Sequence, residues 1–284
     1  MRVDLIVIDG QNDFLDPNGA LYVKGADAEA LKLKAMIERL GQKITKIHAT
    51  LDSHHPVDIA HPIMWKDQNG KHPDPFTIIS AQDVRDGRWT CTLLGYFNSE
   101  KKITFQDKTL AYVEQLEKNN RYPLCIWPPH CLIGEWGNNV YPVLSEAYKS
   151  WIGVTARSPW INYVTKGDYP FTEHYSALQA DVPEPNMPRT RLNTDLLSDI
   201  SNADMVVWTG WAGSHCLANT GRDFINHFSK TSDAFIKKSV LLTDVCAPVG
   251  DLPGSTMFAD MRQQFIDDME KAGMTLSTSD QLLT

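Results

Sequence analysis

A cysteine that follows a glycine-rich turn has the setting of a reactive, nucleophilic thiol. The run Met205–Thr209 is apolar, Gly210–Gly213 reads as a turn, and Cys216 begins an amphipathic stretch. Unpaired N–H groups and the dipole at the first turn of a helix stabilise a thiolate. The turn can also direct backbone N–H groups at an oxyanion. The alternative is a buried structural cysteine, the common role of a free thiol, which we assign to Cys91, Cys125, Cys131 and Cys246.

Two charged residues come at the ends of other apolar runs. Asp9 follows Leu5–Ile8, and Lys166 follows Trp160–Thr165. The carboxyl ends of parallel strands line the ligand crevice of such a sheet, so both side chains would meet Cys216 there. Asp9 can then act as the base for the thiol, and Lys166 supplies positive charge. A turn-capping aspartate and a solvated lysine are the alternative for each residue alone.

Candidate metal ligands follow the apolar run Ile47–Leu51 and lie close to Trp127 in the sequence. They are Asp52, His54, His55, His61 and His130. One carboxylate with two or three imidazoles suits a borderline divalent ion with an open position. We expect zinc, with iron or manganese as other choices. A histidine-rich loop without metal is the alternative, and spacing does not choose among His54, His55 and His61.

Three aromatic residues flank these polar groups: Phe14, Trp127 and Tyr175. Aromatic rings of this kind can sandwich a flat substrate. Aromatic side chains of the core fit the same pattern.

The elements that would position these residues alternate between strand and helix. Short apolar runs predict strands at Leu5–Ile8, Ile47–Leu51, Leu124–Trp127, Trp160–Thr165, Met205–Thr209 and Val240–Thr243. Amphipathic stretches predict helices at Leu31–Leu40, Thr109–Lys118, Leu192–Ser201, His215–Phe228 and Thr256–Ala272. This alternation is typical of a largely parallel sheet covered on both faces.

One long segment breaks the rhythm, because Pro56–Lys108 shows little periodicity. The Pro-rich stretch Asp181–Arg191 is predicted to be a crossover. We therefore expect one domain over residues 1–284 with an irregular insertion at about residues 56–120. The insertion could cover the pocket, change the substrate or form a subunit interface, and we expect a homo-oligomer.

Composition narrows the class of protein. The net charge is −8, which disfavours a nucleic-acid or anionic-membrane surface as the main role. No apolar run is long enough to span a bilayer, and Leu5–Ile8 is too short for a signal-peptide core. The five cysteines are odd in number and widely spaced, unlike a disulfide framework. These features predict a cytoplasmic protein without a nucleic-acid or membrane partner.

Taken in order, five segments resemble the signature segments of the nicotinamidases, which are isochorismatase-like cysteine hydrolases. The segments are Asp9-Gly-Gln-Asn-Asp-Phe, Asp52-Ser-His, Trp127-Pro-Pro-His-Cys, Lys166-Gly and Gly210-Trp-Ala-Gly-Ser-His-Cys216. The similarity runs from about residue 3 to the end of the sheet near Ala247. It implies an α/β fold with a six-stranded, mainly parallel sheet and helices on both faces, in a Rossmann-like three-layer arrangement.

The resemblance also implies an activity, the hydrolysis of nicotinamide to nicotinate and ammonia through a cysteine thioester, used in NAD salvage. It assigns the catalytic triad to Asp9, Lys166 and Cys216, and the oxyanion hole to the N–H groups of Ala212 and Cys216. It makes Trp211–Ala212 a cis peptide. It assigns the divalent metal to Asp52, His54, His61 and His130, and the ring pocket to Phe14, Trp127 and Tyr175.

The sequence departs from the family pattern in three places. The step from His54 to His61 is seven residues, where small members commonly have six, and six would select His55. The segment between His54 and His130 is about 50 residues longer, and Gly213 stands where many relatives have threonine. An amidase of the same fold acting on another small amide is therefore an alternative. An isochorismatase proper is disfavoured by Cys216, and a non-catalytic metal- or ligand-binding relative is disfavoured by the intact triad.

Overall fold

A parallel sheet forms the centre of the computed structural model, which describes residues 1–119, 121–154, 160–250 and 254–284. Its six strands lie in the order β12-β11-β10-β1-β2-β9, and every neighbouring pair is parallel. The strands are β1 (Val3–Ile8), β2 (Lys46–Asp52), β9 (Asn162–Lys166), β10 (Met205–Gly210), β11 (Ser239–Leu242) and β12 (Thr275–Ser277). The predicted six-stranded α/β fold is therefore confirmed.

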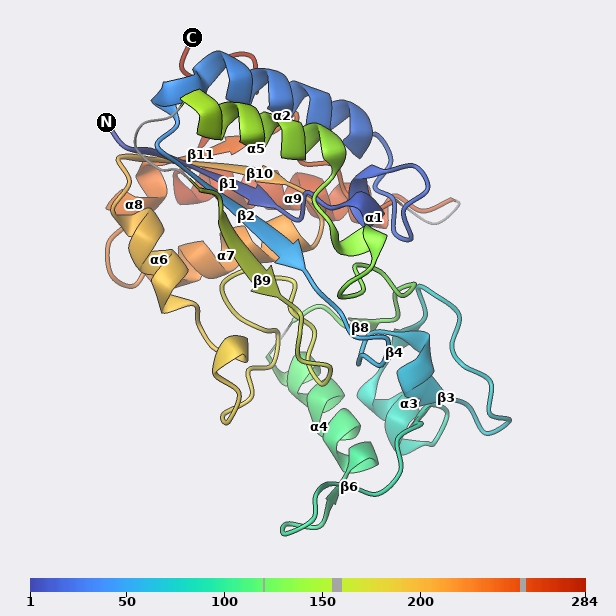
Figure 1. Ribbon diagram of the computed structural model, residues 1–284. Coiled ribbons are helices and arrows are strands. Elements are labelled where there is room, and N and C mark those ends of the chain that lie inside the picture. The colour runs from blue at the N-terminus through green and yellow to red at the C-terminus, as the bar shows by residue number, and fades with distance from the viewer. Residues whose placement is uncertain (120, 155–159, 251–253) are drawn as a thin grey trace.

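Helices cover both faces of this sheet (Figure 1). On one face α2 (Ala26–Leu40) packs beside α5 (Pro142–Val154), and on the other α7 (Cys216–Phe228) packs against α9 (Met257–Ala272). The short α6 (Thr194–Ser201) and α8 (Ala234–Lys237) precede β10 and β11. All six residues of β1 are buried, as expected for a central strand that is covered on both faces. No helix in the described ranges is long and apolar enough to cross a membrane.

Two predictions about the strands are wrong. In the run Leu124–Trp127 only Leu124–Cys125 is a strand, β8, and it pairs antiparallel with β4 (Ile78–Ile79) outside the main sheet. The sixth strand of the sheet is instead β12, so the sheet extends past Ala247. Apolar runs of a few residues report burial but not which partner strand they pair with, and β12 is only three residues long.

The segment between β2 and β9 carries many short elements rather than one extended loop. They are η2 (Pro62–Met64), β3 (Trp65–Lys66), β4, α3 (Ala81–Arg85), β5 (Thr90–Cys91), β6 (Tyr96–Asn98), β7 (Ile103–Thr104), α4 (Phe105–Lys118), β8, η3 (Trp136–Asn138) and α5. Capping boxes begin both α3, at Ser80, and α4, at Thr104, so the helix predicted from Thr109 starts earlier. In Figure 1 this segment extends from the carboxyl end of β2.

The remaining short elements lie near chain turns. They are α1 (Asn12–Leu15), η1 (Gly41–Lys43) and η4 (Pro188–Thr190). Helix α1 follows β1 directly, which places Phe14 at the carboxyl edge of the sheet. The Pro-rich stretch Asp181–Arg191 contains η4 and leads into α6, in agreement with the predicted crossover.

Candidate active site

The structure brings the three predicted catalytic residues together at the carboxyl edge of the sheet. Asp9 follows β1, Lys166 ends β9, and Cys216 is the first residue of α7. All three side chains are buried. The Lys166 Nζ lies 2.9 Å from Asp9 Oδ2 and 3.6 Å from Cys216 Sγ. A cation, a carboxylate and a thiol therefore share one enclosed space.

The charge states of these groups follow from their burial. Burial raises the pKa of Cys216 well above its ordinary value, and the lowering effect of Lys166 does not offset it. Burial likewise raises the pKa of Asp9, against the effect of Lys166. The expectation of a thiolate at rest is therefore wrong, because the helix-terminus argument left out burial and the nearby carboxylates of Asp9 and Asp52. The resting group is a thiol, and Asp9 is a stronger base than an exposed aspartate.

A threonine of the neighbouring strand fixes the orientation of Asp9. The Thr50 hydroxyl donates to Asp9 Oδ1 at 2.5 Å, and the Asp9 N–H donates to Thr50 Oγ1 at 2.9 Å. Both side chains are buried, and Asp9 has a φ of 50°. Because Oδ1 is engaged by Thr50, Oδ2 is left to face Lys166 and the thiol.

The turn before Cys216 has the shape that the resemblance implied. The Trp211–Ala212 peptide is cis. Within the described part of the chain, the backbone N–H groups of Ala212 and Cys216 donate no hydrogen bond. A Cβ at Gly213 would lie 2.0 Å from the carbonyl oxygen of Cys246, so this turn requires glycine. Two free N–H groups beside the sulfur can receive an oxyanion.

A second group of polar side chains lies directly beside the catalytic residues. Asp52, His54 and His130 each offer a ligand atom within 4.8 Å of the others. The Nε2 atoms of His54 and His130 lie 3.2 Å and 3.6 Å from Asp52 Oδ2. His54 is buried whereas His55 is exposed, so the structure places His54 in this cluster. His61 lies beside it, with its ring 5.1 Å from that of His54.

The imidazoles are arranged as metal ligands would be. The Nδ1 atom of each ring faces an oxygen acceptor: Asp58 for His54, Pro128 O for His130 and Pro56 O for His61. In the neutral rings a proton on each Nδ1 satisfies these contacts and leaves a lone pair on Nε2 for a cation. Among the described residues, the buried Nε2 atoms of His54 and His61 have no hydrogen-bond partner. Unpartnered buried nitrogens around a carboxylate fit a divalent metal, and zinc suits this donor set.

Asp52 connects the two groups. Its Oδ1 lies 3.0 Å from Lys166 Nζ, while Oδ2 faces the imidazoles. Burial raises the pKa of Asp52, but Lys166 and His54 outweigh it and hold the pKa well below its usual range. Asp52 is therefore a permanent anion at neutral pH, as a metal ligand requires.

A small cavity of about 20 Å³ joins the thiol to this cluster. Its walls include the three predicted aromatic residues, Phe14, Trp127 and Tyr175, together with Leu21, Asp52, His130, Glu173, Ala212, His215, Cys216 and Val249. The Trp127 Nε1–H donates to the Tyr175 hydroxyl at 2.9 Å. Aromatic walls of this kind suit a small flat molecule.

Two polar residues of the cavity wall were not predicted, Glu173 and His215. Burial raises the pKa of Glu173 to about 8, and its Oε2 has no partner among the described residues. Burial lowers the pKa of His215 to about 3, so this ring is neutral. The ring lies edge-on to Trp127. His215 directly precedes Cys216, and this adjacency was a usable signal in the sequence. Glu173 follows β9 after an irregular loop, where the sequence gives no periodicity to orient it.

The raised pKa of Glu173 predicts a pH-dependent stability. The folded protein holds this proton more tightly than the unfolded chain, so metal-free protein loses stability as pH rises from about 4.5 to about 8. Glu173→Gln cannot ionise and removes this loss. We compare the melting temperatures of the metal-free variant and metal-free wild type. We expect the variant's advantage to grow by several degrees between about pH 5 and about pH 9. If the two melting temperatures differed by the same amount at both pH values, Glu173 would be ionised over this whole pH range.

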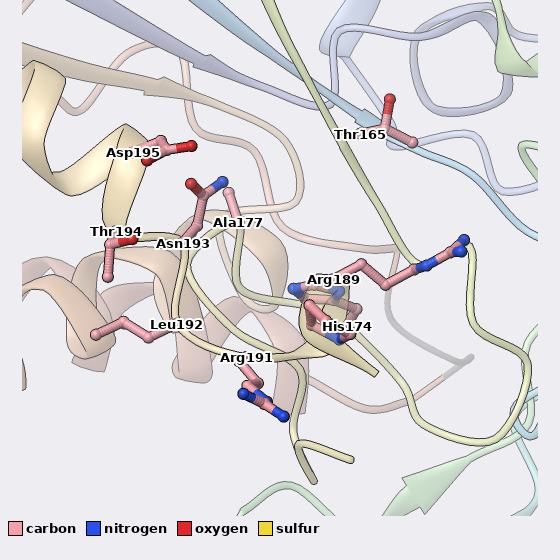
Figure 2. A pocket seen from close by; sticks show the side chains of 10 residues that line it. Thr165, His174, Ala177, Arg189, Arg191, Leu192, Asn193, Thr194 and Asp195 are labelled. Atoms are coloured by element: carbon pink, nitrogen blue, oxygen red, sulfur yellow. The ribbon is translucent and has the colours of Figure 1, made fainter. Parts of the chain in front are cut away.

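A larger cavity lies at the edge of the sheet, between β9 and the start of α6 (Figure 2). Thr165, His174 and Asn193 line it, together with Arg189 and Arg191. Arg189 leads away to pair with Asp168, and the Arg191 guanidinium donates to the carbonyl of Pro185. None of the lining residues is a cysteine. We therefore assign catalysis to the smaller cavity, which Cys216 lines.

Comparisons with known proteins support the fold. No family model matches the chain, and no curated protein matches it in sequence. Among solved structures, the yeast nicotinamidase Pnc1p bound to the inhibitor nicotinaldehyde is similar over 97% of this chain and 99% of its own, at 17% identity and a TM-score of 0.62. An Acinetobacter baumanii nicotinamidase/pyrazinamidase covers 99% and 98%, at 20% identity and a TM-score of 0.60.

A third solved structure, the Pyrococcus horikoshii pyrazinamidase in complex with zinc, covers 98% of this chain and 99% of its own. Its identity is 17% and its TM-score 0.53. Similarity at these identities is evidence of a common architecture. The chain therefore has the α/β fold of these solved nicotinamidase and pyrazinamidase structures.

Proposed function

We propose that this protein hydrolyses nicotinamide to nicotinate and ammonia with Cys216 as the nucleophile. The observation that carries the proposal is the meeting of a thiol, a carboxylate and a lysine, with Lys166 Nζ 2.9 Å from Asp9 and 3.6 Å from Cys216, at the wall of a small cavity. The solved neighbours act on or bind small aromatic ring compounds of this kind, by their names. In the cell this reaction would serve NAD salvage.

The chemistry uses the chain's own groups in sequence. Asp9 takes the thiol proton as the sulfur attacks the carboxamide carbon, and Lys166 stabilises the charge that passes between them. The N–H groups of Ala212 and Cys216 receive the oxyanion. Protonated Asp9 then returns its proton to the leaving ammonia, and a thioester remains on Cys216. Water, activated by the same carboxylate, attacks the thioester and releases nicotinate.

The metal cluster would bind the ring rather than break the amide. Asp52, His54 and His130, with His61 beside them, would hold a divalent metal, which supplies a Lewis-acid contact for the pyridine nitrogen. Phe14, Trp127 and Tyr175 would hold the faces and edges of the ring. The carboxamide would then point at Cys216, which lies across Asp52 from the imidazoles.

Comparing nicotinamide with benzamide tests this assignment, since benzamide has the same ring size and amide but no ring nitrogen. We expect kcat/KM for ammonia release from nicotinamide to exceed that from benzamide by at least ~10-fold, because benzamide has no ring nitrogen to contact the metal. The preference should disappear when the metal is removed by a chelator. Equal rates for both amides with metal-loaded protein would favour the alternative, an amidase of this fold without pyridine recognition.

A further inference from the structure

A buried aspartate beside the metal cluster contacts the ring of His54. Asp58 lies in the loop between β2 and η2, and its side chain is 1% exposed. Its Oδ2 lies 3.2 Å from His54 Nδ1, and its Oδ1 accepts the Ala60 N–H at 3.1 Å. Within the described ranges no lysine or arginine forms an ion pair with it. Burying a carboxylate without a cationic side chain beside it is costly, so its contact with His54 needs a reason.

That contact determines which nitrogen of His54 is available. A carboxylate accepts hydrogen bonds, so the proton of the neutral ring lies on Nδ1 and the lone pair lies on Nε2. The Nε2 atom is buried without a hydrogen-bond partner and lies 3.2 Å from Asp52 Oδ2. Asp58 thus aims the free lone pair at the other ligand atoms.

The other two imidazoles lack a partner of this kind. The Nδ1 atoms of His130 and His61 face the backbone carbonyls of Pro128 and Pro56, which carry no net charge. A carboxylate behind an imidazole raises the basicity of the far nitrogen more than a carbonyl does. His54 is therefore the imidazole whose affinity for a cation the chain strengthens most.

We propose that Asp58 is a positioning residue that fixes the ring of His54 and thereby sets the affinity of the cluster for its divalent metal. This inference rests on the metal centre of the proposed function. Asp58 is absent from the cavity wall, so it acts through His54 and not on the substrate.

The test is the zinc affinity of Asp58→Asn, measured on purified metal-free protein by competition with a chromophoric chelator. Asparagine keeps the size and an oxygen for the Nδ1–H but removes the charge. We expect one zinc per chain to bind ~10–100-fold more weakly than in wild type. Circular dichroism confirms that the variant is folded, and Asp58→Ser provides a second variant if asparagine is not tolerated.

A matched control lies at the opposite end of the same strands. Asp4 is also a buried aspartate facing a histidine, with Oδ2 3.4 Å from His48 Nε2. Asp4→Asn therefore makes the same chemical change away from the cluster, and its zinc affinity should equal that of wild type.

Each outcome decides between distinct failures. If wild type binds no zinc, the metal centre is wrong and the role of Asp58 falls with it. If wild type binds zinc and the Asp58 variants bind it equally well, the centre stands and the role of Asp58 is wrong. An equal weakening in Asp4→Asn would mean that affinity follows global stability, which also overturns the inference.

Discussion

Replacing Cys216 by alanine is expected to lower kcat for nicotinamide hydrolysis at least ~10³-fold. Alanine cannot form the thioester, and the cavity offers no second thiol. Ammonia release by the purified variant, at saturating nicotinamide, measures the effect. The melting temperature should stay close to that of wild type, since Cys216 Sγ fills little volume.

Cys91→Ala is the matched control for this substitution. Cys91 is also a buried free cysteine, but it lies in β5 against Met64 and outside the cavity. The activity of Cys91→Ala should stay within a few-fold of that of wild type. If Cys216→Ala kept more than about a tenth of the wild-type rate, a different group would be the nucleophile.

Asp9→Asn is expected to lower kcat by ~10²–10⁴-fold with a much smaller change in KM. The asparagine amide cannot take the proton of a thiol whose pKa burial has raised well above its usual value. Lys166 keeps an anionic partner in Asp52, 3.0 Å away, so the fold around the lysine should survive. Steady-state rates of ammonia release across a range of nicotinamide concentrations separate the two parameters.

Asp16→Asn serves as the control for Asp9→Asn. Asp16 caps α1 near the same loop, but its carboxylate binds Asn18 and does not line the cavity. It should leave kcat unchanged. A loss below tenfold in Asp9→Asn would show that another group accepts the thiol proton.

Much of the site was predictable because a parallel sheet brings the carboxyl ends of its strands to one edge. Asp9, Asp52 and Lys166 each lie at or directly after the end of a strand, and Cys216 starts the helix after β10. Apolar runs locate those strand ends well in sequence. The order of the strands then makes these four residues neighbours, whatever the loops between them do.

The remainder depended on packing that sequence periodicity does not encode. The role of Thr50 could not be predicted, because it consists of a contact from β2 to Asp9 at the end of the neighbouring β1. Glu173 and Asp58 lie in irregular loops, where no periodic pattern indicates which way a side chain points. The charge state of Cys216 was mispredicted for the same reason, since burial follows from distant segments that close over the turn.

The most direct test of the account is the conversion of nicotinamide by purified protein loaded with zinc, beside Cys216→Ala under the same conditions. The account predicts equimolar ammonia and nicotinate from wild type and no turnover above background from the variant. Turnover that survives in Cys216→Ala would contradict the assigned nucleophile. A wild-type protein that binds zinc, is folded and yet releases no ammonia from nicotinamide would contradict the proposed function itself.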